Sequence, residues 1–213
     1  MSIKAAIFDM DGTLLDSMQI YETAYNATLR ALGYEPRDGL REAVRPLSGT
    51  EILRYLQREY AMPQSLEQIE AALDAQLFGY YSTTPQLKPG VLRLLETLES
   101  RGIPMAVATA TKRVHVEAAL ERVGIARFFR RIFTCSEENT GKTQPRIFLT
   151  AAAFLGAEPR DTYVFEDALH AVTTAKNAGF YVVAVADASA ARHRAEIIAA
   201  ADEFYEDLEG ITL

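Results

Sequence analysis

Short apolar runs alternate with amphipathic segments along most of the chain. Four runs are uniformly apolar, and each is followed by polar or small residues and then by a segment with helical periodicity. Uniformly apolar runs of this length are typical of parallel strands that are buried on both faces of a sheet. Strands that alternate with helices indicate an α/β fold. The four runs lie at residues 5–8, 105–108, 163–165 and 181–186.

The segment 17–85 has a different pattern. It shows helical periodicity that glycine and proline residues interrupt, and it contains no clear strand. We therefore predict an all-helical cap domain over residues 17–85, inserted into a Rossmann-like α/β core with a mostly parallel sheet. The core comprises residues 1–16 and 86–213. The helices expected in the cap lie at residues 20–32, 50–60 and 66–81, and those expected in the core at 91–101 and 112–122.

The composition is that of a globular protein without a strong affinity for polyanions. Of the 213 residues, 49% are apolar and 24% are charged, and the net charge is −7. An acidic surface argues against a main role in binding nucleic acid or anionic membranes, although a few local donors can bind a phosphate inside a cleft. No apolar run is long enough to span a bilayer, and no signal-peptide core precedes the first carboxylates. We therefore expect a cytoplasmic protein.

Two aspartates directly follow the first apolar run. Asp9 and Asp11 are two positions apart, and Gly12 follows them. A tight turn at the glycine can aim both carboxylates into one site, where like charges repel each other and require a cation or a shared proton. A hard dication such as Mg²⁺ meets this requirement with oxygen ligands. The alternative, a solvated Asp-rich turn, is disfavoured by the apolar strand in front and by Thr13 behind.

Two other strand ends carry candidate groups. Thr109 and Thr111 precede a helix, where hydroxyls, backbone N–H groups and the helix dipole favour an anion, although helix capping is equally compatible with them. Glu166 and Asp167 end a buried run, and adjacent buried acids are costly unless a metal or a donor compensates them. The alternative is an acid pair favoured by a helix N-terminus. Because active sites of parallel sheets lie beyond the carboxyl ends of the strands, these residues and Asp9 predict one common site.

The stretch Asp9-Met10-Asp11-Gly12-Thr13 resembles the first motif of the haloacid dehalogenase-like (HAD) superfamily. The residues that follow it, 14–17, resemble a subgroup related to phosphoglycolate phosphatase and β-phosphoglucomutase. Three more motifs follow in the expected order, so the resemblance covers nearly the whole chain. They lie at residues 107–112, 141–148 and 164–171. The chain departs from the family pattern at four positions. The family usually has proline, an acid, serine and glycine where this chain has Thr143, Arg146, Ala168 and Ala171, respectively.

The resemblance implies roles in catalysis and phosphate binding. Asp9 would be the nucleophile, and Asp11 the general acid and base, with Thr13 positioning Asp11. Thr109 and the backbone N–H of Ala110 would hold the phosphoryl group.

The resemblance also implies the charges that balance the site. Lys142 would neutralise the nucleophile and the phosphate. In the family the acids complete a Mg²⁺ site, with Asp11 contributing its backbone carbonyl and Glu166 binding either directly or through water. The implied metal ligands are Asp9, Asp11, Glu166 and Asp167. No family role falls on His170, and we interpret it as a structural residue.

These roles predict a Mg²⁺-dependent phosphatase that hydrolyses small phosphorylated metabolites through an aspartyl-phosphate intermediate. The cap is expected to act as a lid that excludes water. Its candidate specificity residues are Tyr21, Gly49 and Thr50. The sequence specifies neither the leaving group nor the oligomeric state.

Two alternatives to this function remain. The first is a phosphosugar mutase of the β-phosphoglucomutase type. Such mutases carry a histidine at the position of Tyr21 and usually an aliphatic residue at the position of Thr13, so both features disfavour it. The second is an inactive regulatory or binding module on the same fold, which acids at all the expected positions disfavour. The family's dehalogenases lack an acid at the position of Asp11, so the presence of Asp11 disfavours dehalogenation as well.

Overall fold

The computed structural model describes residues 3–44, 47 and 49–211. Contacts within the chain divide it into two compact units. One unit consists of Met1–Met18 together with Thr84–Leu213, and the other is Gln19–Thr83. The first corresponds to the expected core and the second to the expected helical insertion, with the boundaries at 18/19 and 83/84 rather than at 16/17 and 85/86.

The core unit is built on a six-stranded sheet in which every neighbouring pair is parallel. The strand order is β5-β4-β1-β6-β7-β8, so the first strand of the chain lies in the middle of the sheet. The strands are β1 (Ala5–Phe8), β4 (Met105–Thr109), β5 (Phe129–Thr134), β6 (Thr162–Glu166), β7 (Tyr181–Val185) and β8 (Glu203–Tyr205).

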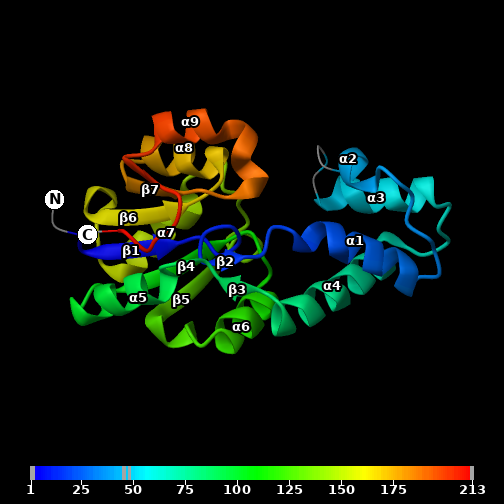
Figure 1. The fold of residues 1–213 in the computed structure, drawn as a ribbon, viewed down its shortest axis with the longest axis horizontal. Helices are drawn as coiled ribbons and strands as arrows, with labels where there is room; N and C mark the ends of the chain where they lie inside the picture. The colour runs from blue at the N-terminus through cyan, green and yellow to red at the C-terminus, as the bar shows by residue number, and fades with distance from the viewer. Residues whose placement is uncertain (1–2, 45–46, 48, 212–213) are drawn as a thin grey trace. The chain divides into compact units, whose positions relative to one another are not determined.

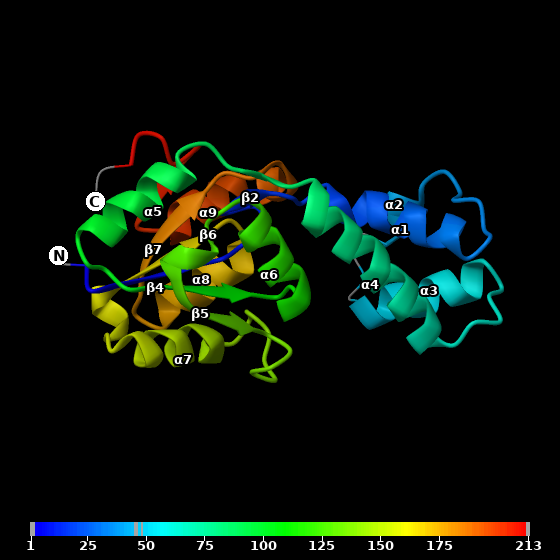
Figure 2. The same ribbon diagram turned by 90° about the horizontal axis from the view of Figure 1, so that it is seen from below.

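Helices cover both faces of this sheet. Right-handed crossovers that move in opposite directions from a central strand place their helices on opposite faces. Accordingly, the strands form a layer between α5 and the pair α8 and α9 (Figure 1), and α5 and α7 lie on opposite sides of the strands (Figure 2). The helices of this unit are α5 (Val91–Ser100), α6 (Arg113–Arg122), α7 (Arg146–Leu155), α8 (Leu169–Asn177) and α9 (Arg194–Ala200).

The four predicted strands are present, and two further strands extend the sheet. The inner strands β1 and β4 are buried at every position. The added strands β5 and β8 lie at the edges of the sheet and are only partly buried. Arg130 and Arg131 are exposed in β5, which suits an edge strand because charged side chains discourage pairing with another chain. The same charges removed the uniform apolar pattern by which the other strands were predicted.

A short antiparallel ladder follows the first strand. It pairs β2 (Leu15–Asp16) with β3 (Gln86–Leu87). The segment between β1 and β2 is a tight turn in which the N–H groups of Leu14 and Leu15 both donate to the Met10 carbonyl at 2.9 Å. The ladder was not predicted, because two residues are too short for a periodic pattern.

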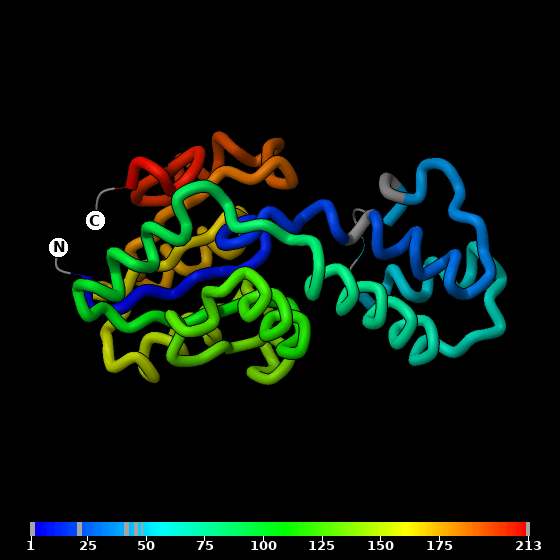
Figure 3. Tube along the Cα trace, turned by 60° about the horizontal axis from the view of Figure 1, so that its bottom comes forward, coloured from blue at the N-terminus to red at the C-terminus, as the bar shows by residue number. Residues whose placement is uncertain are grey.

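The helical unit has its own apolar core. Leu29, Leu56 and Ile69 are almost completely buried in it. Helices α1 and α4 run side by side in this unit (Figure 3). Its helices are α1 (Ile20–Ala31), α2 (Leu40–Val44), α3 (Gly49–Glu59) and α4 (Leu66–Thr83). In the part of the chain that the structure describes, no helix combines the length and the apolar character needed to cross a membrane.

The centre of the sheet should dominate the stability of the core unit. The ring of Phe165 stacks on that of Phe8, with centroids 4.3 Å apart, and neither side chain is exposed. We expect Phe165→Ala to lower the free energy of unfolding by about 3–5 kcal/mol, because it leaves a cavity in a packed core. Urea denaturation measures this loss. Phe154→Ala is the control, because Phe154 is 46% exposed and its loss should be clearly smaller; equal losses would contradict the prediction.

Candidate active site

The candidate groups converge at the carboxyl ends of the central strands. Asp9 follows β1, Thr109 is the last residue of β4, and Glu166 is the last residue of β6. Because β4 and β6 both pair in parallel with β1, their ends meet at the same edge of the sheet. The Asp9 N–H donates to the Phe165 carbonyl at 3.0 Å, which extends the pairing up to the site itself.

A buried lysine joins two of the carboxylates. Lys142 comes from the loop between β5 and α7, and its Nζ forms ion pairs with Asp9 Oδ1 and Glu166 Oε1. Burial lowers the pKa of Lys142. The charges and hydrogen bonds of Asp9 and Glu166 raise this pKa by more than burial lowers it, so the net shift is upward. The lysine is therefore charged at neutral pH and supplies one fixed positive charge to the site.

Asp9 experiences opposing influences. Burial is the largest and raises its pKa, Lys142 lowers the pKa, and the negative charge of Glu166 raises it again. The outcome is a pKa of about 6. Asp9 is thus ionised at neutral pH and only 7% exposed, which gives a desolvated carboxylate oriented by its ion pair with Lys142.

The two adjacent acids at the end of β6 have different surroundings. Glu166 is satisfied on both oxygens: Oε1 pairs with Lys142, and Oε2 accepts hydrogen bonds from the N–H groups of Asp167 at 3.0 Å and Ala168 at 3.1 Å. Lys142 does not pair with Asp167 in the described structure. Burial raises the pKa of Asp167, and the negative charges of Glu166 and Asp9 raise it more.

These three carboxylates can hold a metal ion. Asp9, Glu166 and Asp167 each offer an oxygen, and the three oxygens lie within 4.8 Å of one another. Adjacent buried carboxylates repel unless a cation lies between them, and hard oxygen donors are what Mg²⁺ prefers. The donor set therefore fits a divalent cation. Lys142 and two backbone hydrogen bonds already occupy both oxygens of Glu166. Asp9 and Asp167 are therefore the more available metal ligands.

Asp11 is held apart from this cluster by hydroxyl groups. Its Oδ1 accepts a hydrogen bond from Ser17 Oγ at 2.5 Å, and its Oδ2 accepts one from Thr111 Oγ1 at 2.6 Å. Thr13, which was expected to position Asp11, has a buried hydroxyl with no hydrogen-bond partner among the described residues. The positioning role of Thr13 therefore stays a prediction. Ser17 belongs to the stretch 14–17 that resembles the subgroup, but the sequence did not identify it as a partner of Asp11.

The two threonines at the end of β4 and just after it, Thr109 and Thr111, do not cap the following helix. The N-cap of α6 is Lys112, and no side chain caps it. Thr109 Oγ1 instead accepts a hydrogen bond from the Thr111 N–H at 3.1 Å. Both hydroxyls thus lie within the site: Thr111 holds Asp11, and Thr109 stays a predicted phosphate ligand together with the backbone N–H of Ala110.

The turn after Asp11 requires a glycine for two reasons. Gly12 has φ of 85°, in the left-handed region that other residues rarely adopt. A Cβ at this position would also lie 2.5 Å from Oδ2 of Asp167, well inside contact distance. The glycine therefore lets the peptide after Asp11 pass directly against the Asp167 carboxylate.

Several further residues with reactive or polar side chains belong to other elements. Gly49 begins α3 and Thr50 is exposed on it, both in the helical unit. Tyr21 belongs to α1, and its side chain lies outside the described residues. Burial raises the pKa of Cys135, which does not favour a reactive thiolate. His170 is exposed near the start of α8 and hydrogen-bonds through its backbone carbonyl to Thr174.

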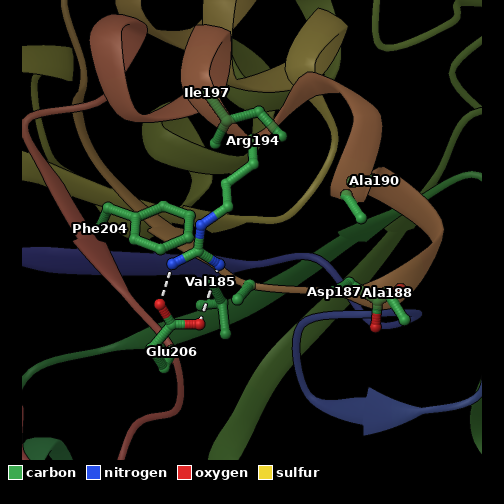
Figure 4. Close-up of a pocket in the computed structure, with 10 residues that line it drawn as sticks. Val185, Asp187, Ala188, Ala190, Arg194, Ile197, Phe204 and Glu206 are labelled. Atoms are coloured by element: carbon green, nitrogen blue, oxygen red, sulfur yellow. Dashed lines mark hydrogen bonds and ion pairs between the residues drawn. The ribbon is translucent and has the colours of Figure 1, made fainter.

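The core unit also contains a separate cavity of about 250 Å³ beside β7 and β8. Figure 4 shows Arg194 and Glu206 paired across it, with the Arg194 guanidinium over the Phe204 ring at 4.7 Å. Because the arginine is already paired, the cavity presents no uncompensated charge from it. Asp187 borders the cavity on the side opposite this pair.

Fold and site together define an α/β protein with buried carboxylates and a buried lysine at the carboxyl edge of a parallel sheet. Comparison with known proteins agrees with this class. The family model of haloacid dehalogenase-like hydrolases matches residues 3–179. The chain belongs to this family.

Curated relatives and solved structures extend the similarity to nearly the whole chain. A probable pseudouridine-5'-phosphatase of Drosophila melanogaster is 30% identical over 215 residues, covering 96% of this chain and 93% of that protein. The β-phosphoglucomutase of Bacillus subtilis is 28% identical, covering 86% and 83%. The crystal structure of CbbY from Rhodobacter sphaeroides in complex with phosphate has 27% identity and a TM-score of 0.82, covering 98% and 96%.

The contact between Gly12 and Asp167 makes a specific prediction for metal binding. We expect Gly12→Ala to weaken Mg²⁺ binding by about 10-fold or more, because the new Cβ displaces the carboxylate beside it. The shift in melting temperature as Mg²⁺ is titrated measures the affinity.

The control for this variant is Gly156→Ala. Gly156 also has a positive φ, of 76°, but a Cβ there would meet nothing within 4 Å. Both substitutions should therefore destabilise the backbone, and only Gly12→Ala should change the affinity for Mg²⁺. An equal Mg²⁺ response in the two variants would contradict the prediction.

Proposed function

We propose that this protein hydrolyses phosphate monoesters of small metabolites through an aspartyl-phosphate on Asp9. The observation that carries the proposal is the pairing of Asp9 with the buried Lys142, next to two further carboxylates. A desolvated, oriented carboxylate is a suitable nucleophile, and phosphoryl transfer depends mainly on positioning and on neutralising charge. The similarity to a probable phosphatase supports the same reaction.

In the first step an Asp9 oxygen attacks phosphorus, and the bond from phosphorus to the ester oxygen breaks. Asp11 gives its proton to the departing alkoxide. In the second step water attacks the phosphorus, Asp11 takes the proton from that water, and the bond from phosphorus to Asp9 breaks. Inorganic phosphate leaves, and both aspartates return to their starting forms.

The other residues of the site act on charge and orientation. Lys142 screens the nucleophile and the phosphoryl oxygens, and Thr109 and the Ala110 N–H would hold those oxygens. Mg²⁺ held by Asp9 and Asp167, with the Asp11 carbonyl as a further ligand and Glu166 as a direct or water-mediated one, would supply additional positive charge to the phosphoryl group.

The hydroxyl contacts of Asp11 support its role as acid and base. Both carboxylate oxygens bind hydroxyls of Ser17 and Thr111 rather than joining the metal-binding cluster. A carboxyl group held by neutral donors is oriented but is not committed to a metal, so it stays available for proton transfer. We propose that the helical unit contributes specificity for the leaving group, with Tyr21, Gly49 and Thr50 as its candidates.

A phosphosugar mutase is the second candidate, because the Bacillus subtilis β-phosphoglucomutase is similar over most of the chain. A mutase returns the phosphoryl group to a sugar, whereas a phosphatase passes it to water. Release of inorganic phosphate from p-nitrophenyl phosphate and from hexose phosphates favours the phosphatase. Interconversion of hexose phosphates without phosphate release would favour the mutase.

The nucleophile can be tested directly. We expect Asp9→Asn to lower kcat for p-nitrophenyl phosphate by at least about 10³-fold, because the amide cannot form the covalent intermediate. The control is Asp161→Asn. Asp161 pairs with Lys4 at 2.7 Å and lies just before β6, at the opposite end of that strand from Glu166. The activity of this variant should match that of the wild type. Turnover by Asp9→Asn at the wild-type rate would rule out Asp9 as the nucleophile.

The acid and base role predicts a different kinetic signature. We expect Asp11→Asn to lower steady-state turnover by about 10²–10⁴-fold. With p-nitrophenyl phosphate, whose leaving group needs little protonation, the variant should still release one equivalent of p-nitrophenol in a rapid burst and then stall as the aspartyl-phosphate. Rapid mixing with mass analysis of the intact protein measures both the burst and the adduct. A steady rate equal to that of the wild type, with no adduct, would contradict the assignment.

A further inference from the structure

A second lysine lies beneath the active-site turn with its ammonium group surrounded by oxygens. Lys88 Nζ donates to the Gly12 carbonyl at 2.7 Å, to the Ala186 carbonyl at 2.6 Å and to Asp187 Oδ2 at 3.0 Å. An ammonium group has three N–H donors, and all of them are used here. The side chains of Lys88 and Asp187 are only 10% and 5% exposed. The ammonium group of Lys88 is therefore enclosed, and each of its N–H groups donates to an oxygen.

The three oxygens come from two loops, and the strands that precede these loops, β1 and β7, are not neighbours in the sheet. Gly12 belongs to the turn after β1, and Ala186 and Asp187 follow β7. Lys88 follows β3, and its own N–H donates to the Leu14 carbonyl at 3.0 Å. The lysine thus contacts the active-site turn at two places, through its backbone at Leu14 and through its ammonium at Gly12.

Gly12 is tightly enclosed within that turn. It lies between Asp11 and the carboxylate of Asp167, and the space for a Cβ at Gly12 is already taken by that carboxylate. A small displacement of the Gly12 carbonyl would therefore shift Asp11 or press on Asp167. In a site where a misplacement of about 1 Å can lower the rate by 10²-fold, a contact that fixes this carbonyl affects the chemistry.

The carboxylate partner of Lys88 is held in place by further contacts. Asp187 is itself fixed, because its Oδ1 accepts hydrogen bonds from the Ser189 N–H at 2.9 Å and the Ser189 hydroxyl at 2.7 Å. The lysine is thus held from behind by a rigid partner.

We propose that Lys88 is a positioning residue of this active site, an internal ammonium that fixes the Gly12 carbonyl and thereby the relative placement of Asp11 and Asp167. The inference rests on the proposed phosphatase function. Lys88 touches neither the phosphate nor the metal site. It acts through the peptide at Gly12, so its loss alters kcat and Mg²⁺ affinity more than substrate binding.

Chemical rescue tests the proposal, because the lost atoms can be returned in solution. Lys88→Ala removes three methylenes and the ammonium, which correspond to propylammonium. We expect Lys88→Ala to lower kcat for p-nitrophenyl phosphate by about 100-fold with little change in KM, and to weaken Mg²⁺ binding measured by thermal shift. Propylammonium should restore kcat in a saturable manner at temperatures where the variant is fully folded. Methylammonium should restore less, because it fills less of the space.

Two controls separate this effect from salt and from general lysine loss. Tetramethylammonium carries the same charge but has no N–H donor, so it should not restore activity. Lys176→Ala removes a lysine whose partner, Asp202, lies 2.5 Å away and whose side chain is 42% exposed; its kcat should equal that of the wild type. Rescue by tetramethylammonium, or a folded Lys88→Ala with wild-type kcat, would overturn the proposal.

A failure of folding would not leave the matter undecided. If Lys88→Ala is unfolded, Lys88→Met keeps the stem and removes the donors, and it should show the same loss of kcat. If that variant is also unfolded, Asp187→Asn keeps Lys88 and both carbonyl acceptors. It should then show a smaller loss of kcat, and wild-type kcat in it would overturn the proposal. The wild type is assayed in parallel: absence of phosphate release by the wild type contradicts the proposed function, whereas wild-type turnover with no effect at Lys88 contradicts this inference alone.

Discussion

The gathering of three carboxylates around one lysine is the electrostatic constraint on which this site depends. Asp9, Glu166 and Asp167 offer oxygens within 4.8 Å of one another, and burial raises the pKa of Asp9 and of Asp167. Lys142 forms ion pairs with the first two, and its charge offsets that of Asp167 only in part. The side of the site formed by Asp167 therefore carries excess negative charge, and a phosphate ester is also an anion. A divalent cation bound there would reduce the repulsion among the carboxylates and the repulsion between the site and its substrate, so we expect metal and phosphate to favour each other's binding.

The scaffold explains how such a cluster can exist in a folded chain. Parallel strands end at a common edge, where backbone N–H groups and loops, rather than apolar side chains, surround the polar residues. Glu166 uses this directly, since the N–H groups of the next two residues bind its Oε2. Gly12 removes the steric barrier between the turn after β1 and Asp167. Close approach of the acids thus results from local backbone geometry, while the apolar layers of the sheet supply the stability.

Much of this arrangement could be predicted from the sequence, and the exceptions have a common cause. The inner strands and the family were predicted correctly, because uniform burial leaves an uninterrupted apolar run and because the motif residues have fixed spacing. Strand β5 was missed because Arg130 and Arg131 point to solvent at the sheet edge. The sequence did not identify the two hydroxyl partners of Asp11, which the structure shows to be Ser17 and Thr111. Contacts between residues distant in the chain leave no periodic or local signal, so only the tertiary structure reveals them.

The two enclosed lysines show how one residue type can serve two different purposes. Lys142 binds carboxylates at the site itself, where the proposed reaction would place a phosphoryl group. Lys88 binds two backbone carbonyls and the carboxylate of Asp187, so its charge is compensated within the scaffold. In the proposed mechanism the first lysine contributes to the electrostatics of the reaction, and the second contributes to geometry. Neither lysine could replace the other. An ammonium group bound to backbone carbonyls is too far from the active site to neutralise an anion there. An ammonium group bound to the active-site carboxylates does not hold the Gly12 peptide in place.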